Sequence, residues 1–145
     1  MCALLLAGCG SLKVEPPALT ASERTACTAL VKALPDHVND QNARSLSGTA
    51  VAAWGDPAIV LRCGVDKPKG FTKVAQCQTA NGMDWFVPNS ASNDPGANVV
   101  MTAVGRVPLV QVTVPAQYRP EGLPATMIDL AKAIRAHTKV VSHCQ

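Results

Sequence analysis

The residue with the clearest chemistry in this chain is the cysteine at position 9. It ends the tetrapeptide Leu6-Ala7-Gly8-Cys9, which follows a short apolar run and precedes a proline-bearing polar stretch. This pattern is the lipobox, which a bacterial lipoprotein signal peptidase cleaves once the cysteine thiol has been diacylated. We therefore expect residues 1–8 to be the remnant of a signal peptide. Residues 9–19 are then the lipidated cysteine and its tether.

The predicted signal is shorter than usual. A secretory signal has a basic amino-terminal region and roughly 7–15 apolar residues, whereas only eight residues precede Cys9 and none of them is basic. Either the coding sequence starts upstream of Met1 or the match is accidental. We favour the first explanation, because Cys9 lies where an apolar run gives way to a flexible stretch. The expected location is the outer face of the cytoplasmic membrane, in the cell envelope, with the lipid as anchor.

Four cysteines remain once the signal and Cys9 are set aside. They are Cys27, Cys63, Cys77 and Cys144. An even number of cysteines in an oxidising compartment predicts two disulfides, for which three connectivities exist. We expect Cys63 to pair with Cys77, on neighbouring strands, and Cys27 to pair with Cys144, joining the two ends of the domain. Structural zinc needs closely spaced cysteine pairs, so we expect no metal and no cofactor.

Helical signals stand at both ends of the mature chain. The capping box Thr20-Ala21-Ser22-Glu23 predicts the start of a helix that Pro35 ends. Pro124 is suited to the first position of a last helix. The predicted buried stripe of that last helix is Met127, Ile128, Ala131 and Ile134. Its carboxyl end carries Lys132, Arg135 and His137, where the helix dipole favours cations.

Strand signals occupy the middle of the chain, after a polar segment, residues 36–48, that we expect to be irregular. Asn81-Gly82 is a strong hairpin signal, and residues 89–98 are predicted to be a surface loop. The predicted strands are Thr49–Trp54, Ala58–Cys63, Val74–Thr79, Met83–Val87, Val99–Val104 and Pro108–Val114. The expected fold is α+β: an antiparallel sheet of about five to six short strands flanked by an amino-terminal and a carboxy-terminal helix. We expect residues 20–145 to form one globular domain that is cross-linked by disulfides.

Six residues are candidates for recognition, and each has a plain structural alternative. They are Trp54, Asp56, Arg62, Asp84, Trp85 and Arg106. An acid at a turn and an arginine within an apolar strand could line a site. The alternative, which we favour, is that Asp56 caps its turn and Arg62 pairs with a carboxylate on a neighbouring strand. The two tryptophans are then packing residues.

Known catalytic motifs are absent from the sequence. It contains neither a G-x-S-x-G elbow nor a glycine-rich phosphate loop after a strand, and its three histidines, His37, His137 and His143, are far apart. The net charge of +3 is small and only five residues are aromatic, so we expect no nucleic-acid binding. Lys67, Lys69 and Lys73 are either the solvated tip of a loop, which we favour, or a contact for an anionic headgroup or wall polymer.

The residues carry one family resemblance. The string Trp54–Gly64, the segment Asp84-Trp85-Phe86 after Cys77, and Val104–Pro108 ahead of Val112–Pro115 resemble an uncharacterised group of actinobacterial secreted proteins and lipoproteins, a domain of unknown function. The similarity runs from about Thr20 to Ile134. It implies an actinobacterial envelope protein, and it implies no activity or catalytic residue.

Three kinds of function are compatible with the sequence. We favour a non-enzymatic module of the envelope that binds or scaffolds an envelope protein partner. A carrier of a lipid or other apolar ligand would need an apolar cavity. An enzyme acting on cell-wall precursors would need carboxylates such as Asp56, Asp66 and Asp84 brought close together.

Overall fold

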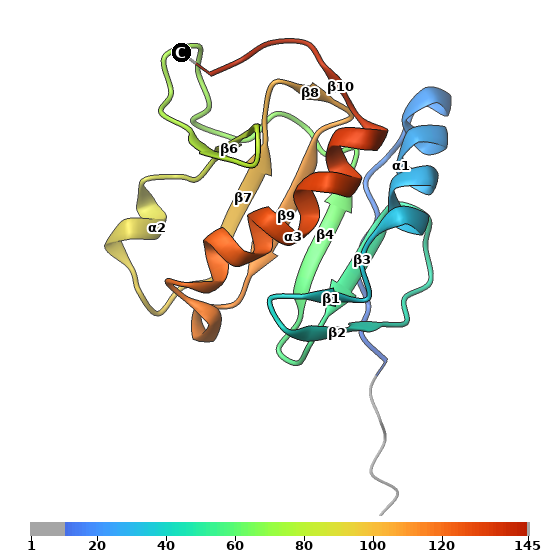
Figure 1. The fold of residues 1–145 in the computed structure, drawn as a ribbon, viewed down its shortest axis with the longest axis horizontal. Helices are drawn as coiled ribbons and strands as arrows, with labels where there is room; N and C mark the ends of the chain where they lie inside the picture. The colour runs from blue at the N-terminus through green and yellow to red at the C-terminus, as the bar shows by residue number, and fades with distance from the viewer. Residues whose placement is uncertain (1–10, 145) are drawn as a thin grey trace, which may run out of the picture.

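The structure, a computed structural model, describes residues 11–144 and shows two helices packed on one large sheet (Figure 1). The lipobox and Cys9 lie outside the described residues. Eight strands form an antiparallel sheet in the order β1-β2-β3-β4-β9-β7-β6-β5. They are β1 (His37–Val38), β2 (Gln41–Arg44), β3 (Val51–Trp54), β4 (Ile59–Cys63), β5 (Gln78–Ala80), β6 (Met83–Phe86), β7 (Val99–Ala103) and β9 (Val110–Val114). A two-stranded sheet pairs β8 (Arg106–Val107) with β10 (Lys139–Val140).

The helices are α1 (Ala21–Ala33), the short α2 (Ser90–Asn93) within the predicted loop, and α3 (Gly122–His137), with a 3-10 turn η1 (Ala116–Tyr118) before α3. Figure 1 shows α3 lying across the sheet with α1 at its side. No helix of the described residues has the length and apolar character needed to cross a membrane. The predicted α+β class, with helices from both ends of the chain on an antiparallel sheet, is confirmed. The sheet has more strands than the five to six expected.

The predicted amino-terminal cap is present. The Thr20 hydroxyl accepts a hydrogen bond from the Glu23 N–H (3.3 Å), and the Thr20 N–H donates to the Glu23 carboxylate (2.8 Å). Helix α1 ends just before Pro35, as predicted, and buries Cys27 and Leu30 against the sheet.

We expect Thr20→Ala to lower the free energy of unfolding by about 1 kcal/mol. Hydrogen bonds from the Thr20 backbone and then from its hydroxyl lower the pKa of Glu23. A lowered folded-state pKa adds stability above the unfolded-state pKa, and that stability is lost as pH falls through the folded-state value. Urea unfolding at about pH 7 and about pH 3 should therefore show a smaller cost in acid. An equal cost at both pH values would contradict this account of the cap.

The core lies between the helices and one face of the sheet. Alternate residues of β4 and β9 are buried, which is the period of a strand with one face in the core. These residues are Ile59, Leu61, Cys63, Val110, Val112 and Val114. Helix α3 contributes Met127, Leu130, Ala131 and Ile134. Ile128 was expected in this stripe, but it is 51% exposed. It follows Met127 by one position, which turns it about 100° away from the sheet.

The polar segment 36–48, expected to be irregular, contains the hairpin β1–β2. Its two-residue turn is Asn39-Asp40, and both residues have positive φ. The predicted hairpin at Asn81-Gly82 has the same geometry, with Ala80 opposite Met83. Asn and Asp tolerate the left-handed conformation that such turns require. The β1–β2 hairpin was not predicted from the sequence, although its turn residues suit a hairpin.

All four expected cysteines form disulfides, but both predicted pairings are wrong. Cys27 on α1 is bonded to Cys63 at the end of β4, and Cys77 is bonded to Cys144. The segments that carry Cys63 and Cys77 are consecutive along the chain, but they are not neighbours in space. Strands β9, β7 and β6 lie between β4 and β5 in the sheet. Helix α1 instead brings Cys27 over β4, and the carboxy-terminal segment returns to the edge of the sheet near Cys77.

The predicted tether is held against the domain along part of its length. Arg62 Nε donates to the Glu15 carbonyl oxygen (3.0 Å), and Arg24 Nη2 donates to the Leu19 carbonyl (3.4 Å). Leu19 packs against the core. The expected carboxylate partner of Arg62 is thus replaced by a backbone carbonyl of the amino-terminal segment.

Candidate functional site

The structure does not bring the six predicted recognition residues together. Trp54 is buried in the core, where its Nε1 donates to the Pro35 carbonyl (2.9 Å). Trp85 is likewise buried, and Asp56 is exposed in the β3–β4 turn. Arg62 donates a hydrogen bond to the Glu15 carbonyl of the tether. These four residues are therefore accounted for by packing, a turn and a backbone contact.

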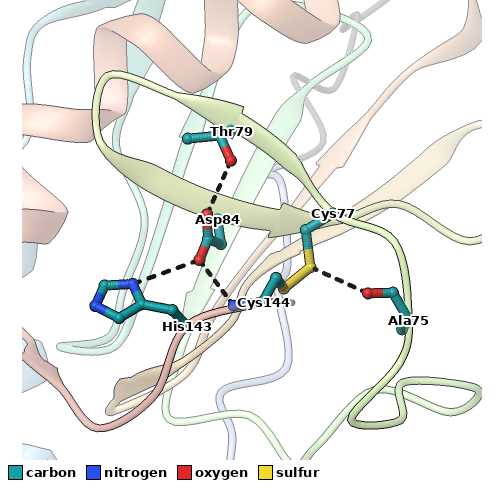
Figure 2. A network of polar contacts seen from close by, with 6 residues as sticks. All are labelled: Ala75, Cys77, Thr79, Asp84, His143 and Cys144. Carbon is teal, nitrogen blue, oxygen red and sulfur yellow. Dashed lines mark hydrogen bonds and ion pairs between the residues drawn. A yellow bond between two sulfur atoms is a disulfide. The ribbon is translucent and has the colours of Figure 1, made fainter.

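Asp84 holds the carboxy-terminal segment in place (Figure 2). Its carboxylate accepts hydrogen bonds from the Thr79 hydroxyl (2.9 Å) and from the Cys144 backbone N–H (3.0 Å). The Nδ1 atom of the exposed His143 lies 3.7 Å from the same carboxylate. Together with the Cys77–Cys144 disulfide, these contacts fix the chain after β10 against the β5–β6 hairpin. The role of Asp84 in the described structure is positional.

Arg106 is the predicted candidate that lies in a site. It sits on β8, is 9% exposed, and donates only to neutral acceptors near the end of α3. Its Nε donates to the Thr138 hydroxyl (2.7 Å), and its Nη2 donates to the carbonyls of Thr138 (3.1 Å) and Arg135 (3.2 Å). A cation suits this position, because the carboxyl end of a helix carries partial negative charge. That partial charge offsets less than the full charge of a guanidinium.

Beside Arg106 the surface is hollowed into a cleft of about 690 Å³. The cleft lies between α3, the β5–β6 turn and β10. Its lining residues are Asn81, Gly82, Arg106, Ile128, Ala131, Lys132, Arg135, Ala136 and Val140. Three of them are cations and none is an acid. Asp84 shares a smaller neighbouring pocket with Arg106, but its oxygens already accept the bonds described above.

Arg106 lies close enough to Arg135 for their positive charges to repel each other. Burial lowers the pKa of Arg106, and the nearby Arg135 lowers it further. Arg135 is held in place by a hydrogen bond from its Nη1 to the Asn81 carbonyl (3.2 Å). Within residues 11–144, no carboxylate forms an ion pair with Arg106, Lys132 or Arg135. An anion entering the cleft would relieve this repulsion.

The carboxylates considered for acid–base chemistry lie on different segments. Asp56 lies in the β3–β4 turn, Asp66 follows β4, and Asp84 is on β6 near the far edge of the sheet. The residues that the structure describes include no group of three or more His, Cys, Asp or Glu side chains that could hold a metal ion.

Sequence reasoning placed Lys132 and Arg135 on the last helix as cations near its carboxyl end, but not in a shared site with Arg106. Their spacing contains a usable signal. Ile128, Lys132 and Arg135 follow one another at i, i+4 and i+7, which places them on one face of a helix. That Arg106 on β8 contacts the carboxyl end of α3 depends on residues far apart in the sequence and could not be predicted from this spacing.

The fold and the cleft define a disulfide-bonded α+β domain with a surface cleft lined by three cations. The two disulfides suggest an extracytoplasmic protein, because such bonds persist in oxidising compartments. The chain belongs to the family described as "Protein of unknown function (DUF3515)", whose sequence pattern matches residues 7–142. No curated protein and no solved structure matches the chain.

Proposed function

We propose that the protein is an exported lipoprotein of the actinobacterial cell envelope, anchored by a lipid on Cys9 and acting as a non-enzymatic binding module. Its binding site is the cleft beside α3, and its ligand presents an anionic group. One observation carries the proposal: Arg106, Lys132 and Arg135 line a single cleft, and its lining among residues 11–144 includes no carboxylate.

The residues of the cleft favour binding over catalysis. Guanidinium groups keep their protons at neutral pH and present several N–H donors in a fixed plane, which suits phosphate or carboxylate oxygens. The described lining of the cleft offers no carboxylate or histidine to take or give a proton. Its chemistry is therefore that of holding an oxyanion.

The docked tether supports the anchoring. Because Arg62 holds Glu15, only six residue steps separate Cys9 from the domain surface. A chain of six residues spans at most roughly 20 Å when fully extended, so a lipid on Cys9 would hold the domain close to the membrane. Lys67 and Lys69 line a pocket together with Pro16 and Pro17. The same side of the domain would then face the membrane, with its lysines toward anionic headgroups.

The binding claim can be tested by calorimetry on the full chain carrying Cys9→Ser, with inorganic phosphate as the probe. We expect the Lys132→Gln/Arg135→Gln variant to bind phosphate at least about tenfold more weakly, because it loses charge-assisted hydrogen bonds. The control, Lys67→Gln/Lys69→Gln, removes the same formal charge elsewhere and should bind as the parent does. Equal losses in the two variants, or no binding by the parent, would contradict the proposal.

The anchor is tested separately, by mass spectrometry of the protein extracted from its native membrane. The expected result is an acylated Cys9 at the amino terminus, together with release of the Cys9→Ser protein from the membrane fraction. A Cys9 peptide without lipid would refute the anchoring while leaving the cleft untouched.

A further inference from the structure

We infer that the ligand of the cleft is a phosphate group carried on an apolar chain. The phosphate lies among Arg106, Lys132 and Arg135, and the chain lies over Ile128 and Val140. This inference rests on the proposed function and deepens it, since it names the chemical class of the ligand.

Both arginines of the cleft have N–H donors that the described residues leave unused. Nη1 of Arg106 makes no hydrogen bond with the described residues, whereas its Nε and Nη2 are engaged. Arg135 uses Nη1 for the Asn81 carbonyl, and within residues 11–144 its Nε and Nη2 donate to no other group. Lys132 is exposed beside them. Three unneutralised cations match a phosphate, which carries up to two negative charges, better than a carboxylate, which carries one.

The β5–β6 turn forms the wall of the cleft beside Arg135. Gly82 has a φ of +73°, and a Cβ at this position would lie 3.7 Å from Arg135 Nη1. The turn therefore lies next to the guanidinium, which donates a hydrogen bond to the Asn81 carbonyl. Arg135 is thus positioned before a ligand arrives, which lowers the entropic cost of binding.

Two apolar, uncovered side chains also line the cleft. Ile128 is 51% exposed and Val140 is 50% exposed, and both line the cleft. Ile128 stands one helical turn before Lys132 on α3. Val140 is paired with Arg106 in the β8–β10 ladder, which places the two side chains on the same face. Apolar and cationic side chains therefore share one continuous surface.

This arrangement suits an amphiphile better than a free anion. Inorganic phosphate would leave Ile128 and Val140 in water, whereas an attached hydrocarbon chain would bury them. A neutral apolar ligand would leave the three cations unpaired. Only a ligand that has both parts would contact both the cationic and the apolar side chains of the cleft.

The test compares three probes on the full chain carrying Cys9→Ser: inorganic phosphate, hexyl phosphate below its micelle concentration, and 1-hexanol. We expect hexyl phosphate to bind about tenfold or more tightly than inorganic phosphate, because its chain buries apolar surface. We expect 1-hexanol to bind more weakly than either. The Ile128→Ser/Val140→Ser variant should lose most of the advantage of hexyl phosphate and keep its affinity for inorganic phosphate. The control Val74→Ser/Val100→Ser, which changes exposed side chains outside the cleft, should keep both.

The outcomes separate the two claims. If inorganic phosphate binds and hexyl phosphate binds no more tightly, the inference is wrong and the proposed function stands. If the cleft variant keeps the full advantage of hexyl phosphate, the chain lies elsewhere and the inference is also wrong. If neither phosphate binds, both claims fail.

Discussion

Replacing Cys27 and Cys63 together by alanine is expected to lower the free energy of unfolding by about 4 kcal/mol. The bond closes a loop between residues 36 positions apart, so its loss enlarges the unfolded ensemble. Both cysteines are fully buried, so the substitution also removes packing between α1 and β4. Urea unfolding without reductant measures the effect directly. A loss below about 1 kcal/mol would contradict this account.

The Cys77–Cys144 bond provides the matched comparison. Its cysteines are only partly buried, and it ties a surface loop to the carboxy-terminal segment. Mild reduction of the folded protein followed by alkylation should therefore label Cys77 and Cys144 before Cys27 and Cys63, because exchange requires access to the sulfur atoms. Peptide mapping reads out both the order and the connectivity. Earlier labelling of the buried pair would contradict the structure.

Trp54→Ala is the substitution of a single side chain with the largest expected cost, about 4 kcal/mol. The indole is 1% exposed, and its Nε1 donates to the Pro35 carbonyl, so it joins β3 to the segment after α1. Its removal leaves a cavity and an unpaired carbonyl, and both destabilise the folded state. Chemical denaturation gives the magnitude.

Substitution of each tryptophan by phenylalanine isolates the hydrogen bond. Trp85 is as buried as Trp54, but its Nε1 has no partner among the described residues. Trp54→Phe should therefore cost about 1 kcal/mol or more beyond Trp85→Phe, since only the first breaks a bond. An equal or larger cost for Trp85→Phe would contradict the assigned contact.

Local features of the fold could be predicted from the sequence. The capping box at Thr20, the end of α1 before Pro35 and the Asn81-Gly82 hairpin each depend on neighbouring residues. The β1–β2 hairpin shows the limit. Its Asn39-Asp40 turn lacks glycine, and its strand residues show no clear alternation of apolar and polar side chains. The segment was therefore expected to be irregular, although its turn residues suit a hairpin.

Long-range features could not be predicted. Consecutive strands in sequence suggested that Cys63 and Cys77 were neighbours, but β9 and β7 return to fill the middle of the sheet. For the same reason, only part of the cleft could be predicted from the sequence. Arg106 was recognised as a candidate, whereas its two cationic neighbours come from α3. Ile128 was assigned to the core, because its apolar character does not tell which side of the helix meets the sheet.

The central claim is that the cleft beside α3 binds an oxyanion. The most direct measurement is a titration of the isotope-labelled full chain carrying Cys9→Ser with inorganic phosphate, followed by nuclear magnetic resonance. The account predicts that shifts concentrate on the amides of Asn81, Gly82 and Val140 and on the Nε–H groups of Arg106 and Arg135. Unchanged resonances there, with shifts confined to the lysines of residues 67–73, would contradict it.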